Sequence, residues 1–226
     1  EVMEALDLCL SCKGCKGDCP VSVDMATYKA EFLAHYYRGR LRPRAAYAMG
    51  LIFRWARLAS LMPGLTNAVT HAPVLRGAVR IAGGFNHERE LPEFAPETFR
   101  AWFRRRKTPE NRNRADRRRG EIVLWADTFN NHFTPHTAQA AVEVLEAAGY
   151  RVSVPKQSLC CGRPLYDYGM LDLAKRKLRQ TMTALRPAIR RGTPIVVLEP
   201  SCASVFRDEL VNLFPDDADA RRLSRQ

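Results

Sequence analysis

Short apolar runs alternate with amphipathic stretches along the second half of the chain. The runs "EIVLWA" at 121–126, "RVSVP" at 151–155 and "IVVLEP" at 195–200 predict buried strands. The apolar spacing between and after them predicts helices at about 137–150, 168–191 and 201–214. Because strands that alternate with helices are joined by right-handed crossovers, we predict a parallel sheet in an α/β unit.

The first half of the chain has a helical pattern. Asp24 precedes "MATYKAEFLAHYYRGR" at 25–40, in which apolar residues recur every three or four positions, so we predict a helix with Asp24 as its N-cap. A second helix is predicted over about 44–62, stopped by the Pro-Gly pair that follows. Arg54 and Arg57 leave two interpretations of this helix, a membrane-surface helix or packing on another helix, and we favour packing.

The net charge of +12 is concentrated in one segment. Residues 100–120 hold ten Lys and Arg residues against Glu110 and Asp116, which is typical of a solvated linker or a strip that docks an acidic partner. No zinc-finger spacing or aromatic-rich basic sheet accompanies it, so we do not expect nucleic-acid binding. Residues 63–99 are rich in Pro and Gly and predict an irregular connection.

These patterns predict an α+β chain in three parts. The first is a helical part over 1–62, the second a connection and basic linker over 63–120, and the third an α/β part over 121–226. No uncharged apolar run reaches the roughly eighteen residues of a membrane span. Seven cysteines fall in two groups, as metal ligands or redox thiols do, so we expect a reducing, cytoplasmic location, with peripheral contact to the inner membrane as an option.

The first group of cysteines lies in "CLSCKGCKGDCP" and comprises Cys9, Cys12, Cys15 and Cys19. Its spacing, C-x2-C-x2-C-x3-C-P, is that known from bacterial ferredoxins, which hold [4Fe–4S] clusters. We expect Gly14 and Gly17 to adopt positive φ around the cluster, and Lys13 and Lys16 to offset the charge of the thiolates. Zinc would need a second C-x2-C pair at a distance, and c-type haem a histidine where Lys13 stands.

In two-cluster ferredoxins the fourth cysteine of this run binds the other cluster. We therefore predict that Cys9, Cys12 and Cys15 converge on one cluster and that Cys19 points toward a second. The companion cysteines are then expected upstream of Glu1.

The second group of cysteines comprises Cys160, Cys161 and Cys202. They follow the second and third predicted strands, and side chains at the carboxyl ends of parallel strands meet at one edge of a sheet, so we expect these thiols to lie close together. They would chelate an iron–sulfur centre or zinc, form a vicinal disulfide, or be buried thiols in a tight turn. Thiol redox catalysis is a further hypothesis, and it needs a lowered thiol pKa, for which Arg163 is the candidate cause.

The stretches "CLSCKGCKGDCPVSVDMATYKAEF", "LCCGRPLYDYG" and "EPSC" together resemble the iron–sulfur part of FAD-linked 2-hydroxyacid oxidoreductases. These include the iron–sulfur subunits of glycolate oxidase and glycerol-3-phosphate dehydrogenase, and large proteins fused to an FAD-binding half. The resemblance implies the second half of a ferredoxin-type module over 1–62 and the first half of a cysteine-rich CCG domain over 121–226. It also implies an FAD-binding domain upstream of Glu1 or in a partner subunit, because no flavin-binding loop occurs here.

The function that the resemblance implies is an electron relay. A 2-hydroxy acid would reduce the FAD, and [4Fe–4S] clusters would pass the electrons singly to a quinone or another acceptor. Whether the chain alone is an enzyme stays open. The alternative is a zinc-binding or structural interaction module without redox activity.

Relatives with a full set of cluster ligands carry a cysteine after the first strand and C-x2-C after the third. This chain has Asp127 and Glu199 at those places, and carboxylates suit iron–sulfur clusters poorly. We therefore predict that Cys160, Cys161 and Cys202 do not hold a complete cluster alone. The second half of the CCG domain is expected beyond Gln226.

Overall fold

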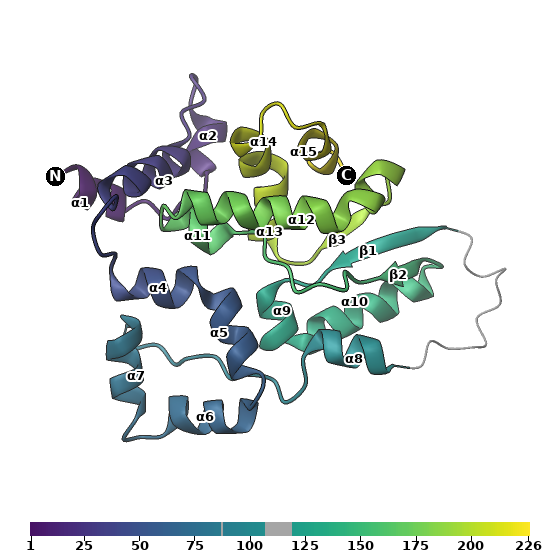
Figure 1. Ribbon diagram of the computed structural model, residues 1–226, viewed down its shortest axis with the longest axis horizontal. Helices are drawn as coiled ribbons and strands as arrows, with labels where there is room; N and C mark the ends of the chain where they lie inside the picture. Colours follow the sequence, from purple (N-terminus) through teal and green to yellow (C-terminus); the bar gives the residue numbers. More distant parts are fainter. Residues whose placement is uncertain (87, 107–118) are drawn as a thin grey trace.

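A three-stranded parallel sheet lies beside an extensive set of helices (Figure 1). The computed structural model describes residues 1–86, 88–106 and 119–226. The strands are β1 (Glu121–Trp125), β2 (Arg151–Ser153) and β3 (Ile195–Val197), in the order β2-β1-β3. Both neighbours pair with β1 in parallel, so the three predicted strands and their parallel arrangement are confirmed.

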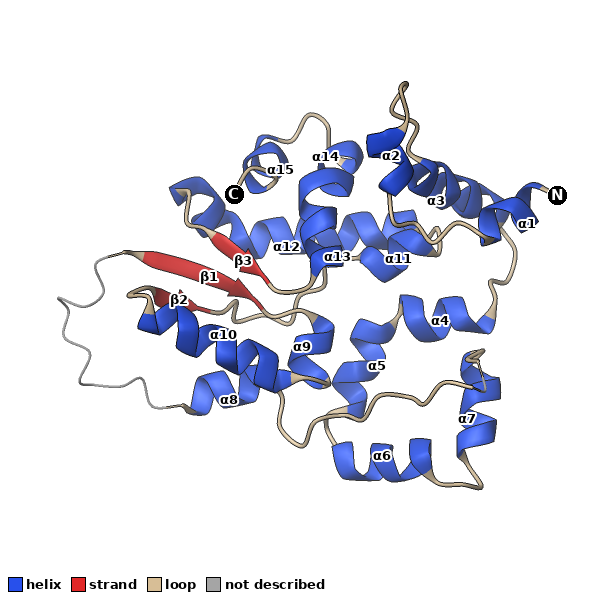
Figure 2. Ribbon diagram, turned by 180° about the vertical axis from the view of Figure 1, so that it is seen from behind, coloured by secondary structure: helices blue, strands red, loops and turns tan. Residues whose placement is uncertain are grey.

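The alternating side chains of β1 build two separate cores, one on each face of the sheet. Ile122 and Leu124 pack with Phe99 and Val142 on one face. Val123 and Trp125 lie on the other face, where the Trp125 ring meets Phe206 edge-on at a centroid distance of 5.0 Å. Figure 2 shows the helices that cover the two faces.

The helices around the sheet follow the predicted order. On the Phe99 side are α8 (Phe99–Arg105), α9 (Thr128–His132) and α10 (Pro135–Ala147). After β2 come α11 (Arg163–Asp167) and the long α12 (Leu171–Arg191). After β3 come α13 (Pro200–Ser204), the π-helical turn η2 (Val205–Glu209), α14 (Leu210–Leu213) and α15 (Ala218–Leu223).

The N-terminal segment (residues 1–62) is helical, as expected. It contains α1 (Val2–Asp7), α2 (Gly14–Asp18) and α3 (Met25–Tyr36). Asp24 caps α3 by accepting a hydrogen bond from the backbone N–H of Thr27 at 3.0 Å, as predicted. That this segment is of the ferredoxin type stays a prediction.

The helix predicted over 44–62 is broken into α4 (Arg44–Gly50) and α5 (Ile52–Ala59). Leu51, with φ −100° and ψ 18°, leaves the helical conformation between them. Gly50 is buried, and a Cβ there would lie 3.5 Å from side-chain atoms of Tyr168 and Met170. The close approach of α4 to the loop between α11 and α12 therefore accompanies the break, which the apolar periodicity does not indicate.

The segment expected to be an irregular connection contains helices instead. Pro63 is the first residue of α6 (Pro63–His71), whereas the previous helix already ends at Ala59. Proline suits the first turn of a helix, because no backbone hydrogen bond is lost there. Gly84, with φ 67°, ends α7 (Arg76–Gly83). Pro and Gly here mark helix ends, so the prediction of irregular structure over this segment was wrong for these residues.

The start of the basic linker is also part of the fold. Arg100–Arg105 belong to α8, whose first residue, Phe99, is fully buried. Arg106 forms a two-pronged ion pair with Glu146 of α10 at 2.7 and 3.0 Å. Of the predicted linker over 100–120, residues 100–106 are therefore part of a helical segment that packs against the sheet unit. Residues 107–118 lie outside the described residues.

The N-terminal segment packs directly on the sheet unit. Arg42 donates to the backbone oxygens of Tyr168 and Gly169 at 3.2 and 2.8 Å, and the Tyr166 hydroxyl donates to Thr27 at 2.9 Å. Gly169, with φ 65°, lies so close to α3 that a Cβ would sit 2.6 Å from the backbone nitrogen of Ala34. Within the part of the chain that the structure describes, no helix is both long and apolar enough to span a bilayer.

The contact at Gly169 makes a first prediction. We expect Gly169→Ala to lower the free energy of unfolding by about 3 kcal/mol, because the new methyl group adds overpacking to the strain of a left-handed backbone. Gly39→Ala is the matched control, since Gly39 has φ 73° but nothing lies within 4 Å of the place a Cβ would take, and it should cost about 1 kcal/mol. Urea unfolding measures both, and equal losses would show that the contact with α3 is loose.

Candidate functional site

The first cysteine group lies on a loop between α1 and α3, here called the cysteine loop (residues 8–20). Cys12 and Cys15 are exposed, while Cys9 and Cys19 are half-buried. Positive φ occurs at Ser11 (55°) and Lys13 (63°), on either side of Cys12. The expectation that Gly14 and Gly17 would adopt positive φ was wrong, because both belong to α2.

The donor chemistry of the cysteine loop fits an iron–sulfur group. Backbone N–H groups of Val23 and Val21 lower the pKa of the Cys19 thiol, which favours the thiolate that binds iron. Nowhere in the described ranges are three or more His, Cys, Asp or Glu side chains arranged to hold a single metal ion. A cubane cluster binds each cysteine through a different iron, so convergence of these sulfurs on a cluster stays a prediction.

The two lysines of the cysteine loop form ion pairs with carboxylates, a contact that was not expected from their place beside the thiols. Lys13 contacts Asp24 at 3.1 Å, Asp208 at a shorter distance and Glu209 at 3.3 Å. Lys16 contacts Asp208 at 2.6 Å. Burial alone would lower the pKa of Lys13, but the hydrogen bonds and charges of these acids raise it above its ordinary value. The lysines therefore fasten the loop to η2, a role that spacing alone does not indicate.

Arg163 joins the two cysteine groups. It comes two residues after Cys161, and its guanidinium donates to the backbone oxygen of Ser11 in the cysteine loop. The same guanidinium contacts Glu209 at 2.5 Å and Asp167 at 3.0 Å. Residues next to the two cysteine motifs thus meet across 152 positions of sequence.

The second cysteine group forms the thiol pocket, a cavity of about 40 Å³ at the carboxyl ends of the strands. Cys160, Cys161 and Cys202 are all buried, and the sulfurs of Cys161 and Cys202 lie 3.0 Å apart. Asp127 and Glu199 line the same pocket. The expectation that these side chains gather at one edge of the sheet agrees with this geometry.

The two carboxylates of the thiol pocket are engaged as helix caps. Asp127 accepts from the backbone N–H groups of Phe129 and Asn130 at 2.9 Å, and its other oxygen accepts from the Asn130 side chain. Glu199 accepts from the N–H and hydroxyl of Ser201. Each acid thus begins a helix at the place where fuller relatives are expected to carry a ligand, and three thiols are an incomplete set for a four-iron cluster.

The pKa values of the two adjacent thiols, Cys160 and Cys161, are raised rather than lowered. The hydrogen bond with Cys161, together with burial, raises the pKa of Cys160 well above its ordinary value. A hydrogen bond with Cys160 lowers the pKa of Cys161, but the contact with Cys202 and burial outweigh it and raise that pKa. This contradicts the hypothesis of thiol catalysis through a pKa lowered by Arg163, whose guanidinium is taken up by carboxylates.

Comparison with known proteins finds a family model that matches the part of the chain containing the three cysteines of the thiol pocket. Residues 127–207 match the CCG family model, described as a cysteine-rich domain. The chain is 28% identical to D-2-hydroxyglutarate dehydrogenase of Pseudomonas putida over 218 residues, which are 92% of this chain and 21% of that protein. The resemblance to the iron–sulfur region of FAD-linked oxidoreductases is confirmed.

Two further relatives cover shorter parts of the chain. One subunit of the anaerobic glycerol-3-phosphate dehydrogenase of Escherichia coli is 25% identical over 146 residues, 64% of this chain and 36% of that relative. Lactate utilization protein A of Bacillus velezensis is 32% identical over 97 residues, 43% of this chain and 39% of that protein. The chain thus spans well under half of each of these relatives. No solved structure matches it.

The ion pairs at Asp208 make a second prediction. Burial would raise the pKa of Asp208, but hydrogen bonds from Lys13 and Lys16 hold it below its ordinary value. Its contribution to stability is therefore present above the ordinary aspartate pKa of about 3.9 and is lost as the pH falls through the lowered folded value. We expect Asp208→Asn to lower the free energy of unfolding by about 1–2 kcal/mol at neutral pH, and the difference from the unmodified chain to vanish in acid.

Unfolding by urea at pH 7 and near pH 3 measures this difference. The matched control is Asp216→Asn, since Asp216 is exposed and forms no ion pair within the described ranges. A loss from Asp208→Asn that stayed constant with pH would show that the ion pairs do not cause it.

Proposed function

We propose that this chain is an iron–sulfur electron-transfer module. The observation that carries the proposal is the cysteine loop, with four thiols at ferredoxin spacing held against a CCG-type unit. Cys9, Cys12, Cys15 and Cys19 would hold [4Fe–4S] clusters, the first three on one cluster and Cys19 toward a second. The bound group would supply one-electron transfer.

The chain's own residues would fix the position of the cysteine loop. Lys13 and Lys16 tie its middle to η2, and Arg163 holds the backbone of Ser11. Lys29 of α3 donates to the backbone oxygen of Cys9 at 2.7 Å. A loop anchored at several points keeps its thiols at constant positions, as repeated electron transfer over a short distance requires.

The partner that supplies the electrons would be an FAD-binding oxidase domain in the same protein or a partner subunit. Two of the relatives are named as dehydrogenases of D-2-hydroxyglutarate and glycerol-3-phosphate, so the parent protein would oxidise a 2-hydroxy acid or a related alcohol. The electrons would go on to a quinone or another acceptor. The protein would act in the cytoplasm, with a peripheral contact to the inner membrane.

The thiol pocket would have a secondary part in this function. Its three thiols would bind metal only with further ligands, because Asp127 and Glu199 are occupied as helix caps. The alternative function is a zinc-binding or structural module without redox activity. The feature that favours it is the short distance of 3.0 Å between the sulfurs of Cys161 and Cys202.

A third prediction separates these functions. We expect the full-length protein, purified without oxygen, to be brown and to contain iron and sulfide, with an electron paramagnetic resonance signal after reduction. Cys12→Ser should remove about four irons per chain, because Cys12 is expected to bind a four-iron cluster. A colourless protein that binds stoichiometric zinc would contradict the proposal.

The matched control is a triple variant of the thiol pocket, Cys160→Ser, Cys161→Ser and Cys202→Ser. It should keep the iron of the cysteine loop. Loss of about four irons from this variant, with the loop cysteines intact, would show that a complete cluster does sit in the thiol pocket.

A further inference from the structure

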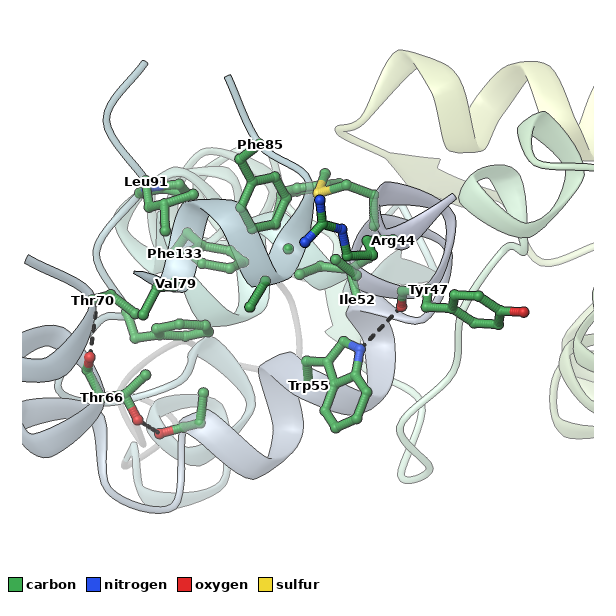
Figure 3. Close-up of a pocket in the computed structure, with 18 residues that line it drawn as sticks. Arg44, Tyr47, Ile52, Trp55, Thr66, Thr70, Val79, Phe85, Leu91 and Phe133 are labelled. Atoms are coloured by element: carbon green, nitrogen blue, oxygen red, sulfur yellow. Dashed lines mark hydrogen bonds between the residues drawn. The ribbon is translucent and has the colours of Figure 1, made fainter. Parts of the chain in front are cut away.

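An apolar cavity of about 570 Å³ lies between α4, α5, α6, α7 and α9 (Figure 3). This volume falls within the range of small-molecule binding sites, which are concave and mostly apolar. Aromatic rings form much of its lining, with Phe94 and Phe133 at a centroid distance of 4.5 Å and Phe129 and Phe133 at 6.0 Å. Planar, apolar ligands suit such a lining because aromatic rings stack on one another.

Most polar groups of the lining are already satisfied by the protein. The hydroxyls of Thr66 and Thr70 donate to backbone oxygens, and the indole N–H of Trp55 donates to the backbone oxygen of Tyr47. In Figure 3 the Tyr47 ring points away from the other lining residues. These groups therefore offer little to a strongly polar ligand.

Arg44 is the exception. Its side chain is exposed at the start of α4, Figure 3 shows its guanidinium turned toward the middle of the lining residues, and it forms no ion pair with any residue that the structure describes. Residues 32–86 contain eight arginines and no Asp or Glu. The segment that adds Leu91, Pro92 and Phe94 to the lining carries Glu88, Glu90 and Glu93, so charges of both signs surround the cavity. Arg44 itself offers hydrogen bonds to an oxygen of a neutral or anionic ligand.

The cavity adjoins the thiol pocket. Ile52 and Phe129 line both cavities, so these two side chains form a wall between them. Phe129 is held there by the helix that Asp127 caps at the end of β1. The electron-transfer function proposed above favours, among planar apolar ligands, one that accepts electrons.

We propose that this cavity binds a planar, apolar carbonyl compound of the quinone class, with a carbonyl oxygen facing Arg44. The assignment rests on the electron-transfer function proposed above, for which it names the site of the acceptor. An aliphatic carboxylate shares the apolar body and the oxygen, but it has no flat ring for the aromatic lining and accepts no electrons.

Equilibrium dialysis of the iron-loaded protein against tetramethyl-1,4-benzoquinone tests this proposal. This probe has no free ring position, so it does not alkylate the cysteines. We expect saturable binding at one site. Val79→Phe, which fills the cavity from α7, should weaken binding at least tenfold. The matched control is Ile81→Phe, because Ile81 lies on the same helix, is 53% exposed and does not line the cavity.

A second pair of variants tests the role of Arg44 without changing the packing. Arg44→Gln should weaken binding three- to tenfold, whereas Arg76→Gln, an exposed arginine of α7 outside the lining, should leave it unchanged. Absence of saturable binding, or equal affinities for Val79→Phe and Ile81→Phe, would overturn the proposal. Tighter binding of decanoate than of the quinone would overturn the ligand class.

Iron content is measured on the same samples. If the purified protein contains no iron but still binds the quinone, the electron-transfer function is contradicted. Iron-loaded protein that fails to bind the quinone would contradict the cavity assignment alone.

Discussion

The buried carboxylate of Glu209 is the charge on which the arrangement of both cysteine groups depends. It has no exposed surface, and it is compensated by Lys13 of the cysteine loop at 3.3 Å and by Arg163 beside the thiol pocket at 2.5 Å. An isolated buried charge costs several kcal/mol, so removing either cation would leave an unfavourable site. Arg163 thus compensates this charge from within the sheet unit, and Lys13 adds a second cation from the N-terminal segment and so joins the two parts of the chain.

The π-helical turn η2 carries two adjacent acids that share Lys13 and each bind one further cation. The turn ends at the buried Glu209, which also pairs with Arg163, while Asp208 stays partly exposed and also pairs with Lys16. Such turns insert one residue into a helix and often occur at functional sites. Here the turn directs two carboxylates from the helix after β3 toward the cysteine loop, which begins almost two hundred residues earlier.

Sequence patterns predict the elements of this fold that are determined by residues close together in the chain. The apolar runs of the three strands and the cap at Asp24 follow from residues close in sequence, and the gathering of the cysteines follows from the parallel direction of the strands they come after. The close packing of Gly50 beside the helix break and the contacts of Lys13 do not, because they involve Met170 and Asp208 far along the chain. The prediction at Pro63 was wrong for a different reason, since a proline that looks like a helix stop can instead be the first residue of the next helix, and α5 already ends at Ala59.

The carboxylate of Asp127 has a consequence beyond the thiol pocket. Asp127 binds the first N–H groups of α9, and α9 carries Phe129 into the wall shared with the apolar cavity. A cysteine at this position would be a weaker cap, because thiols accept hydrogen bonds poorly. The capping of α9 and the shaping of the cavity wall are therefore two effects of one residue. In this chain, the edge of the sheet supports a wall of the apolar cavity as well as a group of thiols.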